Sequence, residues 1–424
     1  MSEPSPGLFE AVGVELEYMI VDAASLDVLP RSDHVIHSVA GDYVAEVERG
    51  DLAWSNELVL HVLEIKTNGP APTLRGLDNL IVRDIIEIER ILSGINARLM
   101  PGAAHPWMDP ARETKIWPHE DNEIYRAFDR IFGCQGHGWS NLQCTHLNLP
   151  FAGDAEFARL HAAIRLVLPI VPALAASSPI LDGRVTGLMD TRMHCYRENQ
   201  KKIPSITGRV IPEPVYTRRD YEEKILGPMY ADIAPFDRDE ILRNEWLNAR
   251  GAIARFDRNT IEIRIIDVQE CPTADMAVAH AITCVLRALV GEKWQPLERQ
   301  MRFGTDALDA ILVATTHTAE GAMVRDRDYL EAFGIHAREA TAGDVWRHLV
   351  ESVVSADADF TGAWQGAMSV ILDEGSLARR IVRTVSGEKP DLAARLGLDR
   401  ELLHAVYRRL CDCLAQNRLF RIPS

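Results

Sequence analysis

The chain has 424 residues, and its 46 basic and 62 acidic side chains give a formal net charge of −16 at pH 7. Hydrophobic residues make up 47% and charged residues 25%. This composition is typical of a soluble globular protein and excludes a disordered, collagen-like or disulfide-scaffold chain. The acidic balance argues against binding to nucleic acid or to an anionic membrane surface, because both require a basic surface.

The N-terminal segment lacks the pattern of a signal peptide, in which an apolar stretch follows basic residues. No apolar run approaches the length of about 18 residues that a membrane span needs. The seven cysteines are scattered and odd in number, unlike the framework of a secreted protein. These features predict a reduced, cytoplasmic protein and leave its oligomeric state open, a homo-oligomer included.

Four strands are predicted in the first two thirds of the chain. Strict alternation of apolar and polar residues predicts the first strand over residues 12–22. Residues 58–67, 141–149 and 260–267 have similar patterns and predict the other three. The long segment 178–220 has no such pattern and is expected to be irregular.

Helices are predicted between and after these strands. Apolar residues with helical spacing predict a long helix over residues 73–100. A further helix begins near Asp154 and should be interrupted at Pro169 and Pro172. The other predicted helices cover residues 122–132, 304–313, 344–355, 366–383 and 398–417, and nearly all of the chain after residue 273 has helical spacing.

The order of the elements predicts an α+β fold with an antiparallel or mixed sheet. Residues 1–300 are expected to form the core of the protein, and residues 301–424 a helical part that packs on it. The two parts together are expected to form one large domain, because no linker or repeat separates them.

Polar side chains recur at alternate positions of all four strands, although Glu is usually depleted in strands. If these faces converge, they form a concave, acidic surface that is unfavourable without bound cations. Carboxylates with a minority of nitrogen ligands favour Mg²⁺ or Mn²⁺ over zinc. A solvent-facing sheet surface is the alternative. The side chains are Glu15 and Glu17, Glu64, His146 and Asn148, and Glu262 and Arg264.

Five segments resemble, in order, segments of the glutamate–cysteine ligase family and of its bacterial carboxylate–amine ligase branch. They are GVELEYMIVD, LEIKTNGP, CTHLNLPF, ALAASSPILDGRVTGLMDTR and TIEIRIIDVQECPTADMAVA. The resemblance implies a glutamine-synthetase-like fold. In such a fold a curved, mostly antiparallel sheet is lined by metal-binding carboxylates and flanked by helices, and here the C-terminal third would be helical.

The resemblance also implies a function. The protein would be an ATP- and Mg²⁺-dependent carboxylate–amine ligase that activates the γ-carboxylate of glutamate as an acyl phosphate. Mn²⁺ could replace Mg²⁺, and cysteine is the expected amine. Two alternatives remain: the same chemistry with another amine, or a metal- and nucleotide-binding protein without turnover on the same fold.

Site residues follow from the resemblance by position. Arg264 would be catalytic, and Asn148, Arg184 and Arg192 would bind substrate or phosphate. Asn148 stands where many members of the branch have a second His. Arg184 and Arg192 belong to residues 184–219, which carry eight basic and three acidic side chains and could equally form a solvated loop. The implied metal ligands are Glu15, Glu17, Glu57, Glu64, His146 and Glu262.

Other motifs are weaker. Cys134, His137, Cys144 and His146 are of the types that bind zinc, but a glycine-rich spacer and the other use of His146 argue against such a site. No P-loop and no dinucleotide-binding glycine motif is present in the sequence. Cys411 and Cys413 are expected to be packing residues of a C-terminal helix.

Overall fold

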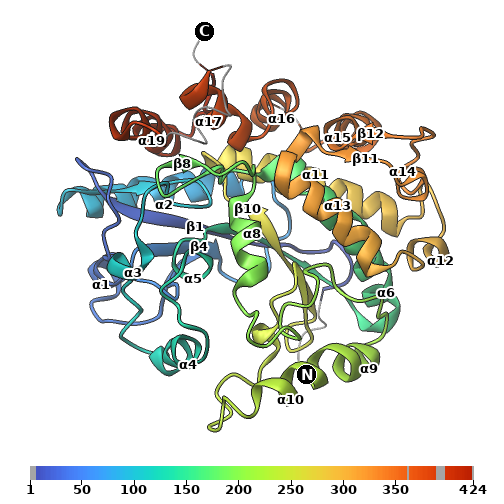
Figure 1. Ribbon diagram of the computed structural model, residues 1–424, viewed down its shortest axis with the longest axis horizontal. Helices are drawn as coiled ribbons and strands as arrows, with labels where there is room; N and C mark the ends of the chain where they lie inside the picture. The colour runs from blue at the N-terminus through green and yellow to red at the C-terminus, as the bar shows by residue number, and fades with distance from the viewer. Residues whose placement is uncertain (1–5, 361, 388–396, 423–424) are drawn as a thin grey trace.

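An eight-stranded antiparallel sheet forms the centre of the α+β fold (Figure 1). The computed structural model describes residues 6–360, 362–387 and 397–422. The strand order is β2-β3-β4-β1-β6-β10-β9, and β5 pairs with β1. The strands are β1 (Gly13–Asp22), β2 (Glu46–Arg49), β3 (Leu52–Asn56), β4 (Val62–Thr67), β5 (Ala97–Met100), β6 (Cys144–Pro150), β9 (Ala252–Arg255) and β10 (Thr260–Asp267).

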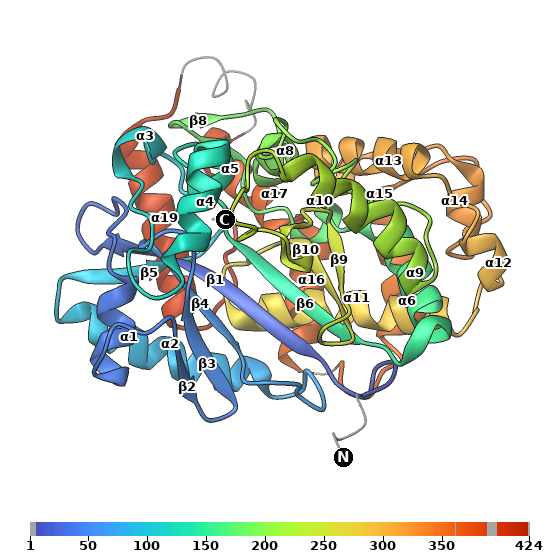
Figure 2. The ribbon, with the colours of Figure 1, turned by 90° about the horizontal axis from the view of Figure 1, so that it is seen from below.

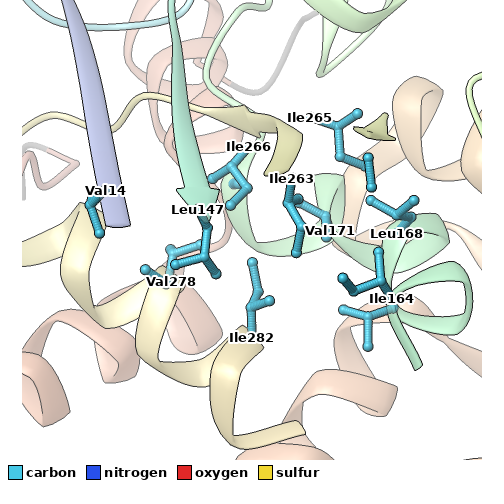
Figure 3. Close-up of a cluster of buried hydrophobic side chains, with 14 of the residues drawn as sticks. Val14, Leu147, Ile164, Leu168, Val171, Ile263, Ile265, Ile266, Val278 and Ile282 are labelled. Atoms are coloured by element: carbon cyan, nitrogen blue, oxygen red, sulfur yellow. The ribbon is translucent and has the colours of Figure 1, made fainter. Parts of the chain in front are cut away.

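One face of this sheet is packed against helices. The strands contribute alternate apolar side chains to this face, among them Val14, Leu147 and Ile263, and these meet Val278 and Ile282 of α11 (Pro272–Val290) (Figure 3). Helices α2 (Leu77–Ser93) and α6 (Gly153–Val167) belong to the same hydrophobic cluster. Because strand side chains alternate between faces, the polar residues of these strands lie on the opposite face.

The C-terminal helices lie along one side of the sheet, as Figures 1 and 2 show. They are α16 (Ala363–Glu374), α17 (Leu377–Ser386) and α19 (Arg400–Ala415). Side chains of α17 and α19 join Met19 and Val21 of β1 in a second hydrophobic cluster. Met19 and Val21 share a face of β1 with Glu15 and Glu17, so the polar part of that face is confined to the first half of the strand.

Helix α11 is the one helix in the described part of the chain that is long and apolar enough to cross a membrane. However, 83% of its most apolar 18-residue window is buried inside the protein. It packs against the sheet, α6 and α16. This environment is that of the core helix of a globular protein.

Shorter elements complete the fold. Two separate two-stranded sheets are formed by β7 (Ile180–Leu181) with β8 (Arg184–Val185) and by β11 (Met323–Val324) with β12 (Ala340–Thr341). The other α-helices among the described residues are α1 (Ser32–Ala40), α3 (Pro110–Glu113), α4 (Asn122–Phe132), α5 (His137–Ser140), α7 (Pro172–Ala175), α8 (Thr191–Glu198), α9 (Arg218–Tyr221), α10 (Gly227–Ile233), α12 (Leu297–Gln300), α13 (Thr305–Thr318), α14 (Arg327–Glu331) and α15 (Ala342–Leu349).

Several sequence predictions were wrong in their bounds. The helix predicted over 73–100 ends with α2, because Asn96 adopts a left-handed conformation (φ 55°) and residues 97–100 pair with β1 as β5. The helix predicted over 366–383 is two helices, divided at Gly375 (φ 93°). The strand predicted over 58–67 begins at Val62, and the segment 178–220 contains α8.

The predictions for 122–132 and 260–267 are confirmed by α4 and β10. The expected alternation of β10 is broken, however, by a β-bulge. Ile263 pairs with Leu147 and Ile266 with Thr145, so Arg264 and Ile265 together occupy the place opposite one residue of β6. A bulge bends its strand and redirects its side chains, and it often lies beside an active site.

Gly251 makes room for this bulge, and we expect Gly251→Ala to lower the melting temperature. A Cβ atom at residue 251 would lie 2.7 Å from Cγ2 of Ile265 and 3.0 Å from Cγ1 of Val210. Overpacking of this kind costs about 1–3 kcal/mol. Gly366→Ala is the matched control. Gly366 is exposed on helix α16, and a Cβ atom at this position would have no atom within 4 Å. Equal melting temperatures of the two variants would contradict this account.

Candidate active site

The polar side chains of four neighbouring strands meet on the face of the sheet that is turned away from α11. Glu17 lies opposite Glu64, and Glu15 lies opposite His146. Directly opposed residues of an antiparallel pair place their Cβ atoms about 5 Å apart on the same face. The same holds for Glu262, which lies opposite Asn148. The strand register therefore brings these side chains together in one polar cluster.

His146 lies at the centre of this cluster. Its Nδ1 atom is 2.8 Å from Oε2 of Glu15, and its Nε2 atom is 3.1 Å from Sγ of Cys144. The side-chain amide of Asn148 donates to the other oxygen of Glu15 (3.0 Å). The backbone N–H of Cys144 donates to Glu17 (2.8 Å). These contacts fix the carboxylates of Glu15 and Glu17 in defined orientations.

Three sets of side chains in this cluster have the geometry of a cation site: Glu17, Cys144 and His146 form one, and the other two are made mostly of carboxylates. Of these two, one consists of Glu17, Glu57 and Glu64, and the other of Glu15, Glu64 and His146. In each of the three sets one potential ligand atom per residue lies within 4.8 Å of the others. Glu64 is common to both carboxylate-rich sets. Because most ligand atoms of these two sets are carboxylate oxygens, they fit Mg²⁺ or Mn²⁺.

The raised pKa values of two carboxyl groups in the cluster also indicate an excess of negative charge. Burial and the charge of Glu15 raise the pKa of Glu64 to about 7. Burial and the neighbouring Glu17 and Glu64 raise the pKa of Glu57 well above its usual value. Burial alone would raise the pKa of Glu15 too, but its hydrogen bond to His146 and the positive charges of His146 and Lys66 lower it. Bound cations would remove the repulsion among these carboxylates.

Arg264 and Glu262 form an ion pair beside the cluster, with 2.6 Å between Nε and Oε1. The second oxygen of Glu262 lies 3.7 Å from Arg255. Within the described residues Glu262 therefore belongs to an arginine network and to none of these cation sets. Its Oε1 atom is 3.9 Å from Nδ1 of His146, so this network adjoins the polar cluster.

Arg192 holds the bulged strand in place. Its guanidinium is completely buried, forms an ion pair with Asp267, and donates to the carbonyl oxygen of Arg264 (3.4 Å). Asp267 in turn accepts from the backbone N–H of Ser177 and the hydroxyl of Ser178. The Ser-Ser-Pro segment is thereby joined to the strand that carries Arg264.

A cavity of about 420 Å³, which we call the aromatic cavity, opens on one side of the cluster. Glu17, Glu57, His146, Arg192 and Arg264 contribute its polar wall. Most of the remaining wall is apolar, and its aromatic side chains come from segments far apart in the sequence. They are Tyr125, Phe128, Trp139, Tyr196 and Trp246.

A second cavity of about 430 Å³, which we call the β1 cavity, lies at the first residues of strand β1. Glu15, Lys66, Asn148 and Arg258 are among its lining residues. Glu15 and His146 touch each other but line different cavities. The polar cluster therefore lies between two spaces, each large enough for a small-molecule ligand.

Some residues predicted from the sequence lie elsewhere. Arg184 is exposed on β8 and is not among the residues that line either cavity. Cys134 and His137 join no metal-ligating group within the described residues, so the four-residue zinc motif does not assemble. His137 instead contacts Asp182 (3.1 Å). Arg192 lines the aromatic cavity, although its guanidinium is occupied by Asp267.

Two residues that contact Glu64 are not predicted from the sequence. The hydroxyl of Ser55 donates to Glu64 (2.5 Å), and Nζ of Lys66 lies 3.2 Å from the same oxygen. Lys66 lies two residues after Glu64 and therefore on the same face of β4, so the period-two pattern could have identified it. Ser55 lies on β3, which was not predicted and therefore gave no signal.

Known proteins match most of the chain. Residues 11–403 match the family model described as glutamate–cysteine ligase family 2 (GCS2). An uncharacterized protein of Archaeoglobus fulgidus is 33% identical over 339 residues, which are 78% of this chain and 91% of that protein.

Two solved structures have a similar fold. The glutamate–cysteine ligase of Francisella tularensis, in complex with AMP, superposes with a TM-score of 0.58 at 10% identity, over 99% of this chain and 91% of that one. A bifunctional glutathione synthetase of Pasteurella multocida gives a TM-score of 0.61 at 12% identity over 96% of this chain. The chain spans about half (53%) of that synthetase. The predicted α+β fold is thus confirmed.

Proposed function

The chain belongs to glutamate–cysteine ligase family 2, a family of carboxylate–amine ligases, and on this basis we propose that it is an ATP- and Mg²⁺-dependent ligase acting on the γ-carboxylate of glutamate. Cysteine is the first amine to test. The observation that carries the proposal is the cluster of carboxylates around His146, which lies between two cavities and beside Arg264.

The residues present fit a magnesium site. Glu15, Glu17, Glu57, Glu64 and His146 would hold the cations. Bound Mg²⁺ would neutralise the charge of the nucleotide phosphates during phosphoryl transfer. Without cations, burial and mutual repulsion keep the pKa values of Glu57 and Glu64 raised. Glu262 is proposed as the carboxylate that orients Arg264.

The proposed reaction has two steps. An oxygen of the γ-carboxylate attacks the γ-phosphorus of ATP, which gives an acyl phosphate and ADP. The amine nitrogen then attacks the acyl carbon, and inorganic phosphate leaves. Arg264 lines the aromatic cavity and is already oriented by Glu262, so its guanidinium can bind the phosphoryl oxygens without first being reorganised.

The central experiment is a screen for ADP release with glutamate and other carboxylic acids, each combined with a panel of amines, and with products identified by mass. We expect ADP release to require both an acid and an amine. If the protein binds ATP and metal but releases no ADP with any pair, the proposed ligase activity is wrong and the protein is a binding protein on this fold.

ATP affinity is expected to depend on divalent metal. No P-loop is present in the sequence, so the nucleotide phosphates would be held largely through cations bound by the carboxylates. Titration calorimetry with Mg²⁺ and with EDTA should show at least about tenfold weaker ATP binding in EDTA. Equal affinities under the two conditions would contradict the proposed ligand set.

The aromatic cavity favours a second candidate for the amine. Its apolar wall could bury the hydrocarbon part of an aromatic or branched amine. Cysteine would leave much of the cavity, whose volume is about 420 Å³, unfilled. Of the two arginines on this wall, Arg192 is paired with Asp267, and Arg264, which Glu262 orients, is assigned to the phosphoryl group. An acceptor that lacks a carboxylate is therefore the alternative to cysteine.

Trp246→Ala should distinguish the two acceptors. If the acceptor is apolar, kcat/KM for that amine should fall at least about tenfold, because a large buried contact is lost. Trp294→Ala is the control, since Trp294 is half-buried and lines neither the aromatic cavity nor the β1 cavity. If cysteine is the best amine and is unaffected by Trp246→Ala, the apolar acceptor is excluded.

A further inference from the structure

A second group of metal-ligating side chains lies on the helix-covered side of the sheet. His280 and Cys284 are four residues apart on α11, so they share one face of that helix. Asp357 approaches them from the segment that precedes α16. Leu149, which points to the opposite face of β6 from His146 and Asn148, lines the small cavity beside this group. The group is therefore separate from the carboxylate cluster.

We propose that His280, Cys284 and Asp357 bind a zinc ion. Nε2 of His280 lies 3.3 Å from Sγ of Cys284 and 3.7 Å from Oδ1 of Asp357. Sγ of Cys284 lies 3.9 Å from Oδ2 of Asp357. Zinc bonds of about 2.0–2.3 Å place neighbouring tetrahedral ligands about 3.3–3.6 Å apart. Movements of a few tenths of an ångström would complete three corners of a tetrahedron.

The three side chains are held in position before any metal binds. His280 and Cys284 are buried, with exposed fractions of 7% and 6%. The His280 ring stacks on Phe360, with 5.7 Å between centroids and an interplanar angle of 4°. The backbone N–H of Asp359 donates to Oδ1 of Asp357 (2.8 Å). Preformed geometry of this kind lowers the entropic cost of binding a metal.

The surroundings leave room for a fourth ligand. A cavity of about 70 Å³ adjoins all three side chains and can hold a water molecule as well as the ion. Arg287, which lines the same cavity, is directed to Phe9, with its guanidinium 4.7 Å from the ring and 3.2 Å from the carbonyl oxygen of Phe9. Three protein ligands and one water are a common coordination of zinc.

The chemistry of the donors separates this site from the carboxylate cluster. A thiolate and an imidazole with one carboxylate favour zinc, whereas Mg²⁺ requires oxygen ligands. The ion would join α11, which packs on the sheet, to the segment that leads into the C-terminal helices. Its expected role is therefore to stabilise the attachment of those helices to the core.

Cobalt substitution tests this proposal, because a cysteine thiolate bound to Co²⁺ produces a charge-transfer absorption. The full chain would be stripped of metal, supplied with Mg²⁺ to occupy the carboxylate cluster, and titrated with Co²⁺. We expect the absorption in the wild type and its loss in Cys284→Ser. Cys144→Ser is the matched control, because Cys144 lies beside Glu17 and His146 and is the competing thiol.

We expect Cys144→Ser to retain the absorption. No absorption in the wild type, or its loss in Cys144→Ser but not in Cys284→Ser, would overturn the proposal. A second measurement uses zinc and the melting temperature, since a ligand that binds only the folded state stabilises it. Zinc should raise the melting temperature of the wild type and of Asp359→Asn but not of Asp357→Asn. An equal rise in Asp357→Asn would exclude Asp357 as a ligand.

Discussion

Glu64→Gln is expected to reduce ATP-dependent turnover at least about a hundredfold while leaving the fold intact. Glu64 is the one residue common to both carboxylate-rich cation sets, so its loss weakens both sites. The amide has nearly the same shape and can still accept from Ser55. The measurement is the rate of ADP release at saturating Mg²⁺. Glu48→Gln is the control, because Glu48 is exposed on the edge strand β2.

The same variant should be more stable than the wild type when metal is absent, and the difference should grow with pH. The pKa of Glu64 is about 7 in the folded protein and 4.5 in its unperturbed state. Between these values the folded state holds more protons than the unfolded state, so the free energy of unfolding falls as pH rises. In EDTA, Glu64→Gln should therefore melt at a higher temperature than the wild type at pH 8, and the two melting temperatures should converge near pH 4.5. If Glu64→Gln releases ADP at the wild-type rate, Glu64 is not a ligand of the proposed metal site.

Arg264→Lys is expected to lower kcat and kcat/KM together by about a hundredfold, or about 3 kcal/mol. Lysine keeps the positive charge but lacks the planar fork that binds a carboxylate and phosphoryl oxygens at the same time. Arg264 lines the aromatic cavity, and its orientation is fixed by the ion pair with Glu262, in which Nε lies 2.6 Å from Oε1. A contact that strengthens in the transition state affects both constants when it is removed.

A purely structural role for Arg264 predicts a different result. Arg264 would then only hold Glu262 and the bulged strand, so Arg264→Lys would lower the melting temperature and leave kcat nearly normal in the folded protein. Arg219→Lys is the control, because Arg219 is exposed on α9 and forms a local ion pair with Glu223. A normal kcat for Arg264→Lys would end the proposal that Arg264 acts in phosphoryl transfer.

Local periodicity was enough to predict the two longest strands and one helix. Strands β1 and β10 and helix α4 are confirmed because a long run of alternating or helical spacing has few competing interpretations. The short strands β2, β3, β5 and β9 were missed. Each has four or five residues, and its conformation depends on a partner strand elsewhere in the chain rather than on its own pattern.

The sequence by itself therefore determined the fold class and the chemical character of the polar face. Acidic residues and a histidine at alternate positions of separate strands pointed to cations before any geometry was known. Only the tertiary structure decided that Glu262 pairs with Arg264, that Arg192 is occupied by Asp267, and that Arg184 lies outside both cavities. These outcomes depend on strand register, on one bulge and on contacts between residues distant in the chain, which single-strand patterns do not encode.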